Sequence, residues 1–413
     1  MIKSNLPGLT PVNEALDKIL QFAAPQQSVE MVRLEHALGR ILAEDQVACC
    51  DVPPADNSAM DGYAFRSQDI ATGDRRLKVT QRIPAGSVGV PVLAGEAARI
   101  FTGAPIPEHA DCVVMQEQCH QEGDLVELPE SVKVRQNIRD RGEDIQKHSV
   151  VLGKGTRIRP QEIGLLASVG VAEIPFFKPL RVAVLSTGDE LVDPGLSLNP
   201  GQIYNSNRFM LVALLNSLGI TLVEARSVED DPDAVRLAVT ELSESCDCII
   251  SSGGVSVGEE DHVVNIIEEM GRLELWRMAI KPGKPLAYGE LEVEGRSVPF
   301  FGLPGNPAAV LVTFCLIVRP YLLKMMGAKE YEPNYCHAIA DFDTKKAGNR
   351  KEYLRAKLVQ GENNTNLVQV FPNQSSGMLS AACWANGFAV IEAGSVVRKG
   401  DQIAFLLFSE LLS

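Results

Sequence analysis

The sequence predicts a multidomain fold of the α/β plus β class, with a central α/β domain, a β-rich insert before it and a small β-barrel at the C-terminus. Three observations lead to this prediction. The 413 residues exceed what one hydrophobic core usually fills. Strand-like and helix-like segments alternate between residues 181 and 327, which is typical of parallel βαβ units. Short alternating strands dominate the regions on both sides.

Composition and charge restrict the class of function. Hydrophobic residues make up 45% of the chain, charged residues make up 22%, and the mean hydropathy is +0.02, which is the balance of an ordinary globular protein. The formal net charge is -14. Proteins that bind duplex nucleic acids gather Lys and Arg to neutralise phosphates, so we expect no nucleic-acid partner.

The sequence also predicts a cytoplasmic protein that does not enter a membrane. The longest apolar run covers residues 308–318 and stops at Arg319-Pro320. It is shorter than the roughly 20 residues that cross a bilayer, so we interpret it as a buried helix. The N-terminus has no apolar segment of the kind that directs export. Nine cysteines without C-x-x-C spacing indicate reduced thiols rather than a zinc or redox site.

Four domains are expected. A helix that begins at Thr10-Pro11 and another that begins at Pro160 are assigned to one elongated helical linker domain, residues 1–45 and 147–179, in which the two helices meet. The β-rich domain is expected at 46–146, the α/β domain at 180–328 and the C-terminal β-barrel at 329–413.

The elements of these domains follow from apolar periodicity and turn residues. The α/β domain is expected to contain strands at 181–185, 220–225, 246–251, 273–279 and 298–301, and helices at 208–218, 232–243, 262–270 and 307–326. The β-rich domain is expected to contain strands at 112–115, 124–128 and 132–135. The C-terminal domain is expected to contain strands at 338–341, 353–358, 367–370, 388–391 and 402–407.

Four strand ends in the α/β domain lead directly into polar loops that contain glycine: 186–190, 251–258, 281–284 and 302–307. In open α/β sheets, ligands bind outside the carboxyl ends of the strands, where backbone N–H groups and helix N-termini face an anion. The four loops together therefore predict a phosphorylated ligand. Each loop taken alone is explained more simply as a turn from strand to helix.

The loops do not match the common phosphate fingerprints. Residues 253–258 do not follow G-x-G-x-x-G, and no glycine loop continues into Gly-Lys-Ser or Gly-Lys-Thr, so ordinary dinucleotide and P-loop enzymes are disfavoured. Arg277, Lys281 and Lys284 offer charge and hydrogen bonds to a phosphate. As solvated surface side chains they would be unremarkable.

Acidic residues occur at the same strand-to-helix transitions: Asp189, Glu190, Asp230, Asp231, Glu259, Glu260 and Asp261. Helix capping explains any one of them equally well. If they converge beside a phosphate, a hard divalent cation such as Mg²⁺ follows, because clustered carboxylates and a phosphate repel each other.

Several segments have specific amino-acid sequences that turn propensity does not explain. In the β-rich domain these are Asp-Asn-Ser-Ala-Met-Asp-Gly-Tyr-Ala at 56–64, Thr-Gly-Ala-Pro at 102–105 and Gly-Glu-Asp at 142–144. In the α/β domain they are 186–191, 253–258, 281–285 and Leu-Pro-Gly-Asn-Pro at 303–307. Together they resemble, in order and spacing and over nearly the whole chain, the molybdopterin molybdenumtransferase family, MoeA, and the related gephyrin E domain.

The resemblance implies a homodimer of elongated four-domain subunits, in which the linker domain mediates dimerisation and the central domain is a three-layer molybdopterin-binding domain. It implies insertion of molybdenum from molybdate into adenylylated molybdopterin, with Mg²⁺ as a helper, release of AMP and formation of the molybdenum cofactor. A molybdopterin adenylyltransferase and the apoproteins of molybdoenzymes are the implied partners.

The resemblance also assigns residues by matching position. It gives catalytic roles to Asp61, Thr102, Arg139, Asp144, Glu190 and Asp261. It gives metal binding to Asp144, Glu190, Asp230 and Asp261. It gives cofactor binding to Gly253, Gly254, Ser256, Arg277, Lys281, Lys284, Pro304, Gly305, Asn306, Pro307 and, as the loosest match, Ser376. Arg277 stands where the family often has lysine. The positive charge is kept, but a compact ammonium group is replaced by a planar guanidinium group.

These residue types suggest a mechanism. We expect Mg²⁺, held by some of the four metal-binding carboxylates, to polarise the phosphoanhydride so that AMP leaves. Arg139 and Thr102 are expected to hold the molybdate dianion. Loss of oxo groups from molybdate requires protons, and Asp61 with a raised pKa is the expected donor.

Two other functions are compatible with parts of the sequence. A molybdopterin adenylyltransferase shares the α/β layer and its Gly253-Gly254 loop, but lacks the motif around Asp61 and the other β-rich modules. A non-catalytic scaffold that binds molybdopterin or partner proteins is the second alternative, which the resemblance to the gephyrin E domain allows, although a free-standing acidic chain speaks against it.

Overall fold

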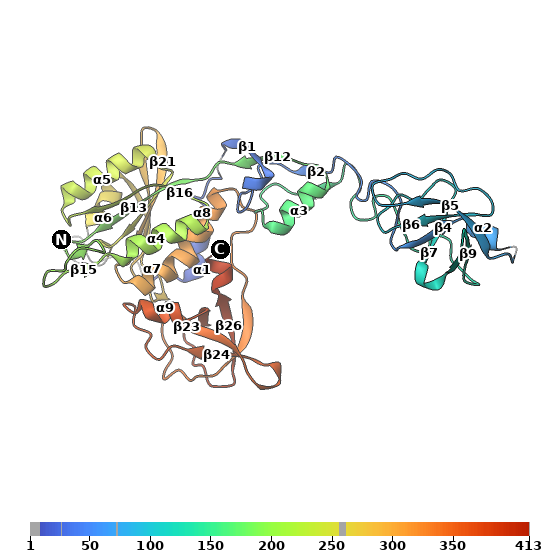
Figure 1. Cartoon of the computed structure of the whole chain (residues 1–413). Coiled ribbons are helices and arrows are strands. Elements are labelled where there is room, and N and C mark those ends of the chain that lie inside the picture. Colours follow the sequence, from blue (N-terminus) through green and yellow to red (C-terminus); the bar gives the residue numbers. More distant parts are fainter. Residues whose placement is uncertain (1–8, 26, 72, 256–261, 413) are drawn as a thin grey trace.

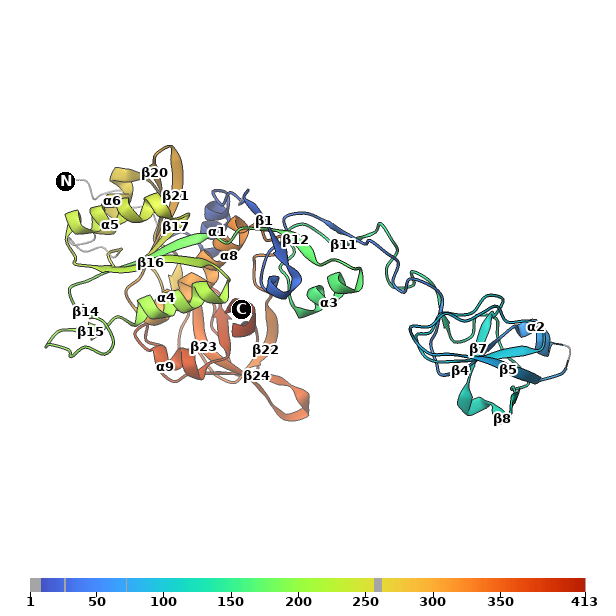
Figure 2. The same cartoon turned by 45° about the horizontal axis from the view of Figure 1, so that its top comes forward.

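The computed structural model describes residues 9–25, 27–71, 73–255 and 262–412. The subunit is elongated (Figure 1), with the α/β domain and the C-terminal domain at one end, a narrow connector in the middle and the β-rich domain at the other end. Figure 2 shows the same arrangement from a second direction. The predicted class, a multidomain α/β plus β fold, is confirmed.

The α/β domain is built on a six-stranded sheet with the order β16-β13-β17-β21-β20-β18. These strands are β13 (Arg181–Thr187), β16 (Thr221–Val228), β17 (Cys248–Ser252), β18 (Gly271–Trp276), β20 (Ala287–Val293) and β21 (Arg296–Leu303). The first four strands in the order are parallel, and β20 is antiparallel to both of its neighbours. The sheet is therefore mixed rather than purely parallel, but β18 still runs in the direction of the parallel strands.

Helices cover both faces of this sheet and give the three predicted layers. One face carries α1 (Val12–Leu20), α4 (Ser206–Ser217), α7 (Pro307–Thr313), the π-helical turn η3 (Phe314–Val318) and α8 (Arg319–Met325). The other face carries α5 (Pro232–Ser245) and α6 (His262–Met270). The stretch Pro307–Met325 is long and apolar enough to cross a membrane, but 89% of its most apolar window is buried, so it is the core helix that the sequence predicts.

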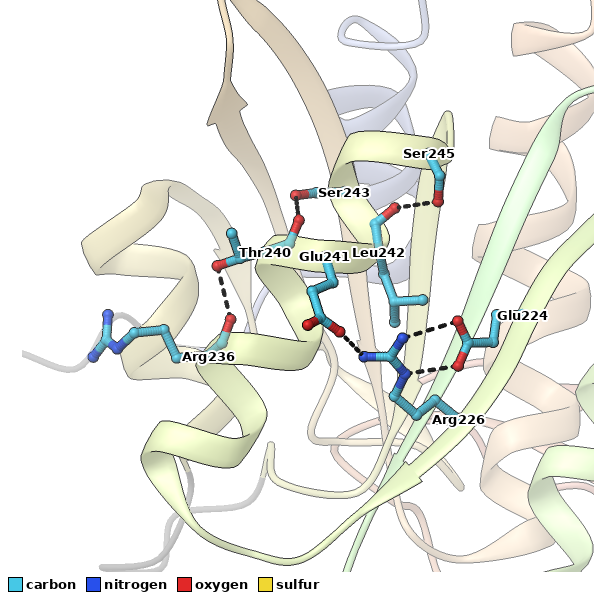
Figure 3. Close-up of polar contacts among 8 residues, drawn as sticks. All are labelled: Glu224, Arg226, Arg236, Thr240, Glu241, Leu242, Ser243 and Ser245. Carbon is cyan, nitrogen blue, oxygen red and sulfur yellow. Dashed lines mark hydrogen bonds and ion pairs between the residues drawn. The ribbon is translucent and has the colours of Figure 1, made fainter.

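Arg226 ties the edge strand β16 to α5 (Figure 3). Its guanidinium donates to both carboxylate oxygens of Glu224 on the same strand, at 2.7 and 2.9 Å, and to Glu241 on α5 at 2.5 Å. The hydrogen bonds that Arg226 donates to Glu224 and Glu241 hold its pKa above the ordinary value. The arrangement braces the helix against the strand next to the turn 229–231, which lies in the predicted site.

The connector joins the two ends of the subunit through short two-stranded pairs. β1 (Val29–Arg33) pairs with β12 (Glu173–Phe177), and β2 (Gln46–Val47) pairs with β11 (Val150–Leu152). The connector also contains η1 (Leu34–His36) and α3 (Pro160–Ser168), whose Leu166 packs with Leu42 and Phe176. The expected meeting of the two helices is wrong, because α1 buries its apolar face in the core of the α/β domain and contacts α8.

The β-rich domain contains a six-stranded sheet with the order β7-β4-β6-β5-β9-β8. Its elements are β3 (Asn57–Ser58), β4 (Gly62–Phe65), α2 (Ser67–Ile70), β5 (Arg76–Ile83), β6 (Glu96–Ile100), β7 (Cys112–Met115), η2 (Gln116–Gln118), β8 (His120–Glu122), β9 (Leu125–Glu127) and β10 (Ile138–Arg139). The expected strand at 132–135 is wrong. Arg135 and Asn137 have positive φ angles, so the chain turns here before it enters β10.

The C-terminal domain is the predicted β-barrel. It contains β22 (Cys336–Ala340), β23 (Lys351–Gln360), η4 (Glu362–Asn364), β24 (Asn366–Val370), α9 (Leu379–Trp384), β25 (Gly387–Ile391), β26 (Gln402–Leu407) and α10 (Phe408–Leu411). The strands follow the order β23-β24-β22-β26-β25, and β25 pairs again with β23, which closes the barrel. The short strand β19 (Ile280–Lys281) leaves the α/β domain and pairs with the start of β23.

Candidate functional site

Five strands of the α/β sheet, β13, β16, β17, β18 and β21, end at one common edge, because all of them run in the same direction. The predicted loops 186–190, 251–258 and 302–307 begin at the ends of β13, β17 and β21 and therefore lie along this edge, the second of them described as far as residue 255. The fourth predicted loop, 281–284, follows the short segment Ile280–Lys281. The helices α4, α5 and α7, each of which runs back from this edge, begin at Ser206, Pro232 and Pro307. The positive ends of their helix dipoles therefore point toward this edge, although the first N–H groups of α5 and α7 already donate to Asp231, Ser376 and Asn306.

The glycine loop at 253–254 comes very close to the end of β13. Gly253 has a φ of 104°, and a Cβ atom there would lie 2.8 Å from the carbonyl oxygen of Thr187. Gly254 has a φ of 66°, and its Cβ would lie 2.7 Å from the Val263 side chain. Both positions therefore require glycine for conformation and for space. The close approach brings the backbone of two strand-end loops together at the candidate site.

Three buried polar atoms at this edge have no hydrogen-bond partner among the residues that the structure describes. They are the Thr187 Oγ1, the Ser251 Oγ and the Asn207 Oδ1. The three residues are 5%, 0% and 9% exposed. A buried polar atom without a partner costs free energy, so their gathering at one edge favours a polar ligand there. Sequence analysis missed all three as site residues, because a buried Ser, Thr or Asn has no sequence signature.

A pocket of about 600 Å³ lies between the ends of β13 and β16, lined by Gly188, Asp189, Leu191 and residues 227–231. Asp189 accepts a hydrogen bond from the backbone N–H of Asp230 at 3.0 Å. Asp231 caps α5 by accepting from the N–H groups of residues 233 and 234, which is the capping role that the sequence left open. Asp189 and Asp230 thus remain at the pocket as candidate metal ligands.

The predicted metal ligands are only partly brought together. Glu190 is exposed beside the pocket, and its carboxylate lies over Gly188. Asp144 lies in the segment that leaves the β-rich domain, where its N–H donates to the carbonyl of Val52. Asp261 and the predicted cofactor-binding Ser256 lie outside the described residues. Within the described ranges, no group of three or more His, Cys, Asp or Glu side chains is placed to hold a metal.

This donor set nevertheless fits one kind of ion. Mg²⁺ is usually bound through one or two carboxylates, with phosphate oxygens and water completing its shell. Asp230 at the pocket and the adjacent Glu190 offer hard carboxylate oxygens of this kind. The residues therefore fit a magnesium ion that arrives with a phosphorylated ligand, rather than a cage made by the protein alone.

The predicted phosphate-binding cations lie where the α/β domain meets the barrel. The Lys281 Nζ donates to both carboxylate oxygens of Glu352, at 3.0 and 3.1 Å. Lys284 is exposed on the same loop. Arg277 was expected on the strand, but it follows β18 and has a φ of 72°. Gly283 has a φ of 110°, and a Cβ there would lie 2.5 Å from the Thr313 side chain, so this loop also requires glycine.

The loop at 304–307 contacts the C-terminal domain. The N–H of Ala308, at the start of α7, donates to the carbonyl of Ser376 at 3.0 Å. The Asn207 side-chain amide donates to the carbonyl of Gly305 at 2.7 Å, and Asn306 is the N-cap residue of α7. Ser376, the loosest match in sequence, therefore lies at the same edge as the glycine loops. Pro304 and Pro307 shape this loop, with Pro307 as the first helical residue.

Arg355 is a candidate residue that sequence analysis missed. It lies on β23, is 1% exposed, and donates from its Nη2 to the carbonyl of Ser375 at 2.9 Å. Its Nε has no hydrogen-bond partner among the described residues. Burial lowers the pKa of Arg355, and a buried cation is costly without an anion. The only signal in the sequence is a charge at an inward position of an alternating strand.

In the β-rich domain, Asp61 and Thr102 form one hydrogen-bonded unit. The Asp61 Oδ1 accepts from both the backbone N–H and the hydroxyl of Thr102, each at 2.8 Å. The next residue, Gly103, donates its N–H to the carbonyl of Ser58 on β3. Arg139 on β10 pairs with Asn57, the first residue of β3. Asp61, Thr102 and Arg139 therefore come together at one end of this domain.

The pKa of Asp61 is shifted downward, whereas an upward shift was expected. Hydrogen bonds from the backbone and the side chain of Thr102 lower the Asp61 pKa below its ordinary value, and the charge of Arg99 lowers it further. The expectation that Asp61 has a raised pKa is therefore wrong for this subunit. The ionised form of Asp61 is thus favoured, and its carboxylate accepts hydrogen bonds from Thr102.

Replacing Thr102 by Val removes the hydroxyl donor and keeps the shape of the side chain. The Asp61 pKa should then rise toward its ordinary value, because the ionised form loses one of its hydrogen bonds. Titration of the Asp61 carboxyl followed by NMR measures this shift. Thr80→Val, at another threonine of the same domain, is the control and should leave the Asp61 pKa unchanged. An unshifted Asp61 in Thr102→Val would show that the hydroxyl bond does not stabilise the ionised form.

The two groups of predicted site residues do not meet within one chain. The α/β edge and the Asp61 group belong to domains at opposite ends of the subunit, and both views show the connector between them (Figures 1 and 2). The expectation that all these residues surround one ligand is therefore not met by a single subunit. Each group by itself holds only some of the predicted site residues.

Comparison with known proteins identifies the family. The MoeA N-terminal region (domain I and II) matches residues 10–170, the probable molybdopterin binding domain matches 183–324, and the MoeA C-terminal region (domain IV) matches 337–408. A molybdopterin molybdenumtransferase of Haemophilus influenzae is 39% identical, over 97% of this chain and 99% of that protein. One of Nostoc sp. is 36% identical, over 92% and 89%.

Solved structures agree with these sequence matches. A crystal structure of the molybdopterin biosynthesis MoeA protein from Pyrococcus horikoshii superposes with a TM-score of 0.83 at 30% identity, covering 97% of this chain and 100% of that one. A second structure of the MoeA protein from the same organism gives a TM-score of 0.76 at 31% identity. With its glycine-lined sheet edge, its β-rich domain and its C-terminal barrel all matched, the chain belongs to the MoeA family of molybdopterin molybdenumtransferases.

Proposed function

We propose that this protein inserts molybdenum from molybdate into adenylylated molybdopterin, releases AMP and forms the molybdenum cofactor. The observation that carries this proposal is the edge of the α/β sheet, where tight glycine loops, helix N-termini, cations and buried polar atoms without partners come together. This combination suits a ligand with phosphate groups and further polar groups. The names of the relatives support the same reaction class.

The proposal includes a homodimer in which the β-rich domain of one subunit covers the α/β edge of the other. Its support is the shape of the chain: the connector places Asp61, Thr102 and Arg139 at the far end of the subunit from the glycine loops. A two-fold related copy would complete both sites at once, because an isologous contact uses each surface twice.

In this proposal, each charged residue binds a different part of the substrates. Lys281, Lys284 and Arg277 hold the phosphate groups, and the positive ends of the α5 and α7 helix dipoles favour negative charge beside them. Arg355 and Arg139 are the arginines for the molybdate dianion, with the Thr102 hydroxyl beside Asp61. Asp61, held ionised by Thr102, accepts a hydrogen bond or a proton from a reacting group.

Magnesium belongs to this proposal as a helper bound through Glu190 and Asp230, with Asp261 and the partner's β-rich domain as further sources of carboxylate. Its chemistry is the polarisation of a phosphoanhydride, which eases departure of AMP. Asp189 orients the Asp230 backbone by accepting its N–H, and so positions that carboxylate at the pocket.

One assay tests the function. Purified protein receives adenylylated molybdopterin, molybdate and Mg²⁺, and the release of AMP and the formation of molybdenum cofactor are measured together. We expect both products in equal amounts, and we expect a chelator to stop turnover and added Mg²⁺ to restore it. A requirement for ATP would indicate an adenylyltransferase instead, and absence of AMP would indicate a scaffold.

The same proposal predicts the protein's surroundings. A molybdopterin adenylyltransferase would deliver the substrate, and apoproteins of molybdoenzymes would receive the product. Cytoplasmic location is part of the proposal and is supported by nine cysteines that are all free thiols.

A further inference from the structure

The ladder between β23 and β24 of the barrel opens at Arg355. The register pairs Ala356 with Val370, so the next pair along the ladder is Arg355 with Phe371. One bond of that pair is present, because the Phe371 N–H donates to the Arg355 carbonyl at 3.0 Å. The Gln374 side chain replaces the other bond: its Oε1 accepts from the Arg355 N–H at 3.0 Å, and its Nε2 donates to the Phe371 carbonyl at 2.9 Å. The amide is therefore inserted between the two strands where they separate.

Both N–H groups of the Gln374 amide are engaged. Besides the Phe371 carbonyl, its Nε2 donates to the Arg355 carbonyl at 2.9 Å, and a glutamine amide has two N–H groups to donate. The side chain thus holds both the N–H and the carbonyl of Arg355. A glutamine used in this way fixes the backbone around it and leaves substrate contacts to its neighbours.

The loop that carries Gln374 reaches from the barrel to the α/β domain. The Ser375 carbonyl accepts from the Arg355 Nη2 at 2.9 Å, and the Ser376 carbonyl accepts from the Ala308 N–H at the start of α7 at 3.0 Å. Gln374 therefore acts on the Arg355 guanidinium in two ways. It holds the backbone from which the side chain leaves, and it anchors the loop whose carbonyl holds the Nη2. Because Arg355 is 1% exposed and closely packed, a shift of either contact moves the guanidinium.

We propose that Gln374 is a positioning residue, which orients the Arg355 guanidinium at the site and does not contact the substrate. The inference rests on the proposed function, in which Arg355 binds molybdate. A planar guanidinium binds an oxyanion through directed N–H bonds, so affinity depends on its orientation as well as on its charge. In metal sites, loss of a group that orients a binding residue usually lowers affinity by about 10- to 100-fold.

Equilibrium dialysis of the full chain against molybdate, with bound molybdenum measured by elemental analysis, tests the proposal. Gln374→Met keeps the length of the side chain and removes all three hydrogen bonds. The Kd for molybdate should rise by about tenfold, the lower end of the range for orienting groups. The Kd for adenylylated molybdopterin should change by less than about threefold, because its phosphates are assigned to Lys281, Lys284 and Arg277. A loss of stability alone would not separate the two ligands.

A second variant and a control accompany Gln374→Met. Asn373→Ala removes the side-chain oxygen that accepts from the Ser375 N–H at 3.0 Å, so it loosens the same loop from an exposed position. It should raise the Kd for molybdate by about two- to fivefold, and it decides the test alone if Gln374→Met does not fold. Gln360→Met is the control, because Gln360 is an exposed glutamine at the far end of β23 that donates to Asn364 at 3.0 Å. Its Kd should equal that of the wild type.

Thermal unfolding confirms that each variant is folded. The proposal is overturned if the wild type binds no molybdate, if Gln374→Met binds molybdate as Gln360→Met does, or if Gln374→Met weakens both ligands equally. A wild type that binds molybdate but forms no molybdenum cofactor contradicts the proposed function alone.

Discussion

Asp61→Asn is expected to lower the rate of molybdenum transfer by about 10²-fold or more, the usual range for loss of a positioned acid or base. The substitution keeps the shape of the side chain but removes the negative charge that Thr102 stabilises with two hydrogen bonds. Binding of adenylylated molybdopterin should change by less than about twofold, because a residue that acts on the reacting groups affects turnover rather than ground-state binding.

Single-turnover measurements of AMP and molybdenum cofactor separate these two effects. Asp124→Asn is the matched control: Asp124 is an exposed carboxylate in a turn of the same domain, 66% exposed beside Lys78. Its transfer rate should equal that of the wild type. Undiminished transfer by Asp61→Asn would remove this carboxylate from the chemistry.

Lys281→Ala is expected to weaken binding of adenylylated molybdopterin by about tenfold or more, because one charge-assisted contact with a phosphate is lost. The turnover rate at saturating substrate should fall much less. Equilibrium titration of the substrate measures the first effect, and the rate at high substrate concentration measures the second.

The ion pair between Lys281 and Glu352 provides the control for this prediction. Its two Nζ–Oε distances, 3.0 and 3.1 Å, show that Glu352 of the barrel holds the lysine. Glu352→Gln removes the competing charge and should leave substrate binding unchanged or make it tighter. Equal weakening by Lys281→Ala and Glu352→Gln would mean that the ion pair supports the loop and that Lys281 does not contact phosphate.

Regular elements with clear periodicity could be predicted well. The helix expected at 262–270 is α6, and the helix expected at 232–243 is α5, two residues longer. Pro232 after Asp231 marks a helix start by a local rule, since proline suits the first turn and aspartate caps it. The five barrel strands were found for the same reason, because alternating side chains face the barrel core and the solvent.

Contacts between distant segments could not be predicted. β20 was missed because Gly289 and Glu290 interrupt its apolar pattern, although all of the first five residues of the strand are buried. The pairing of β19 with β23, which takes Lys281 to the barrel, is decided by how two domains dock and leaves no local pattern. The place of α1 in the core of the α/β domain is a non-local contact of the same kind.

The candidate site was predicted in its parts but not in its geometry. Glycine loops at strand ends follow from topology, so the α/β edge was found from sequence. The sign of the Asp61 pKa shift depends on two hydrogen bonds from Thr102, which is 41 residues away in the chain. The separation of the two groups by the connector depends on the arrangement of whole domains, which a list of motifs does not contain.

Mixing the Asp61→Asn and Lys281→Ala chains tests most directly whether one site draws on two subunits. The variants are unfolded together, refolded and assayed at a substrate concentration well below the Kd of Lys281→Ala. In a shared site, each mixed dimer has one intact site, so about a quarter of the wild-type activity should return, well above the mean of the two separate variants. Activity that stays at that mean, although mixed dimers have formed, would contradict the shared site.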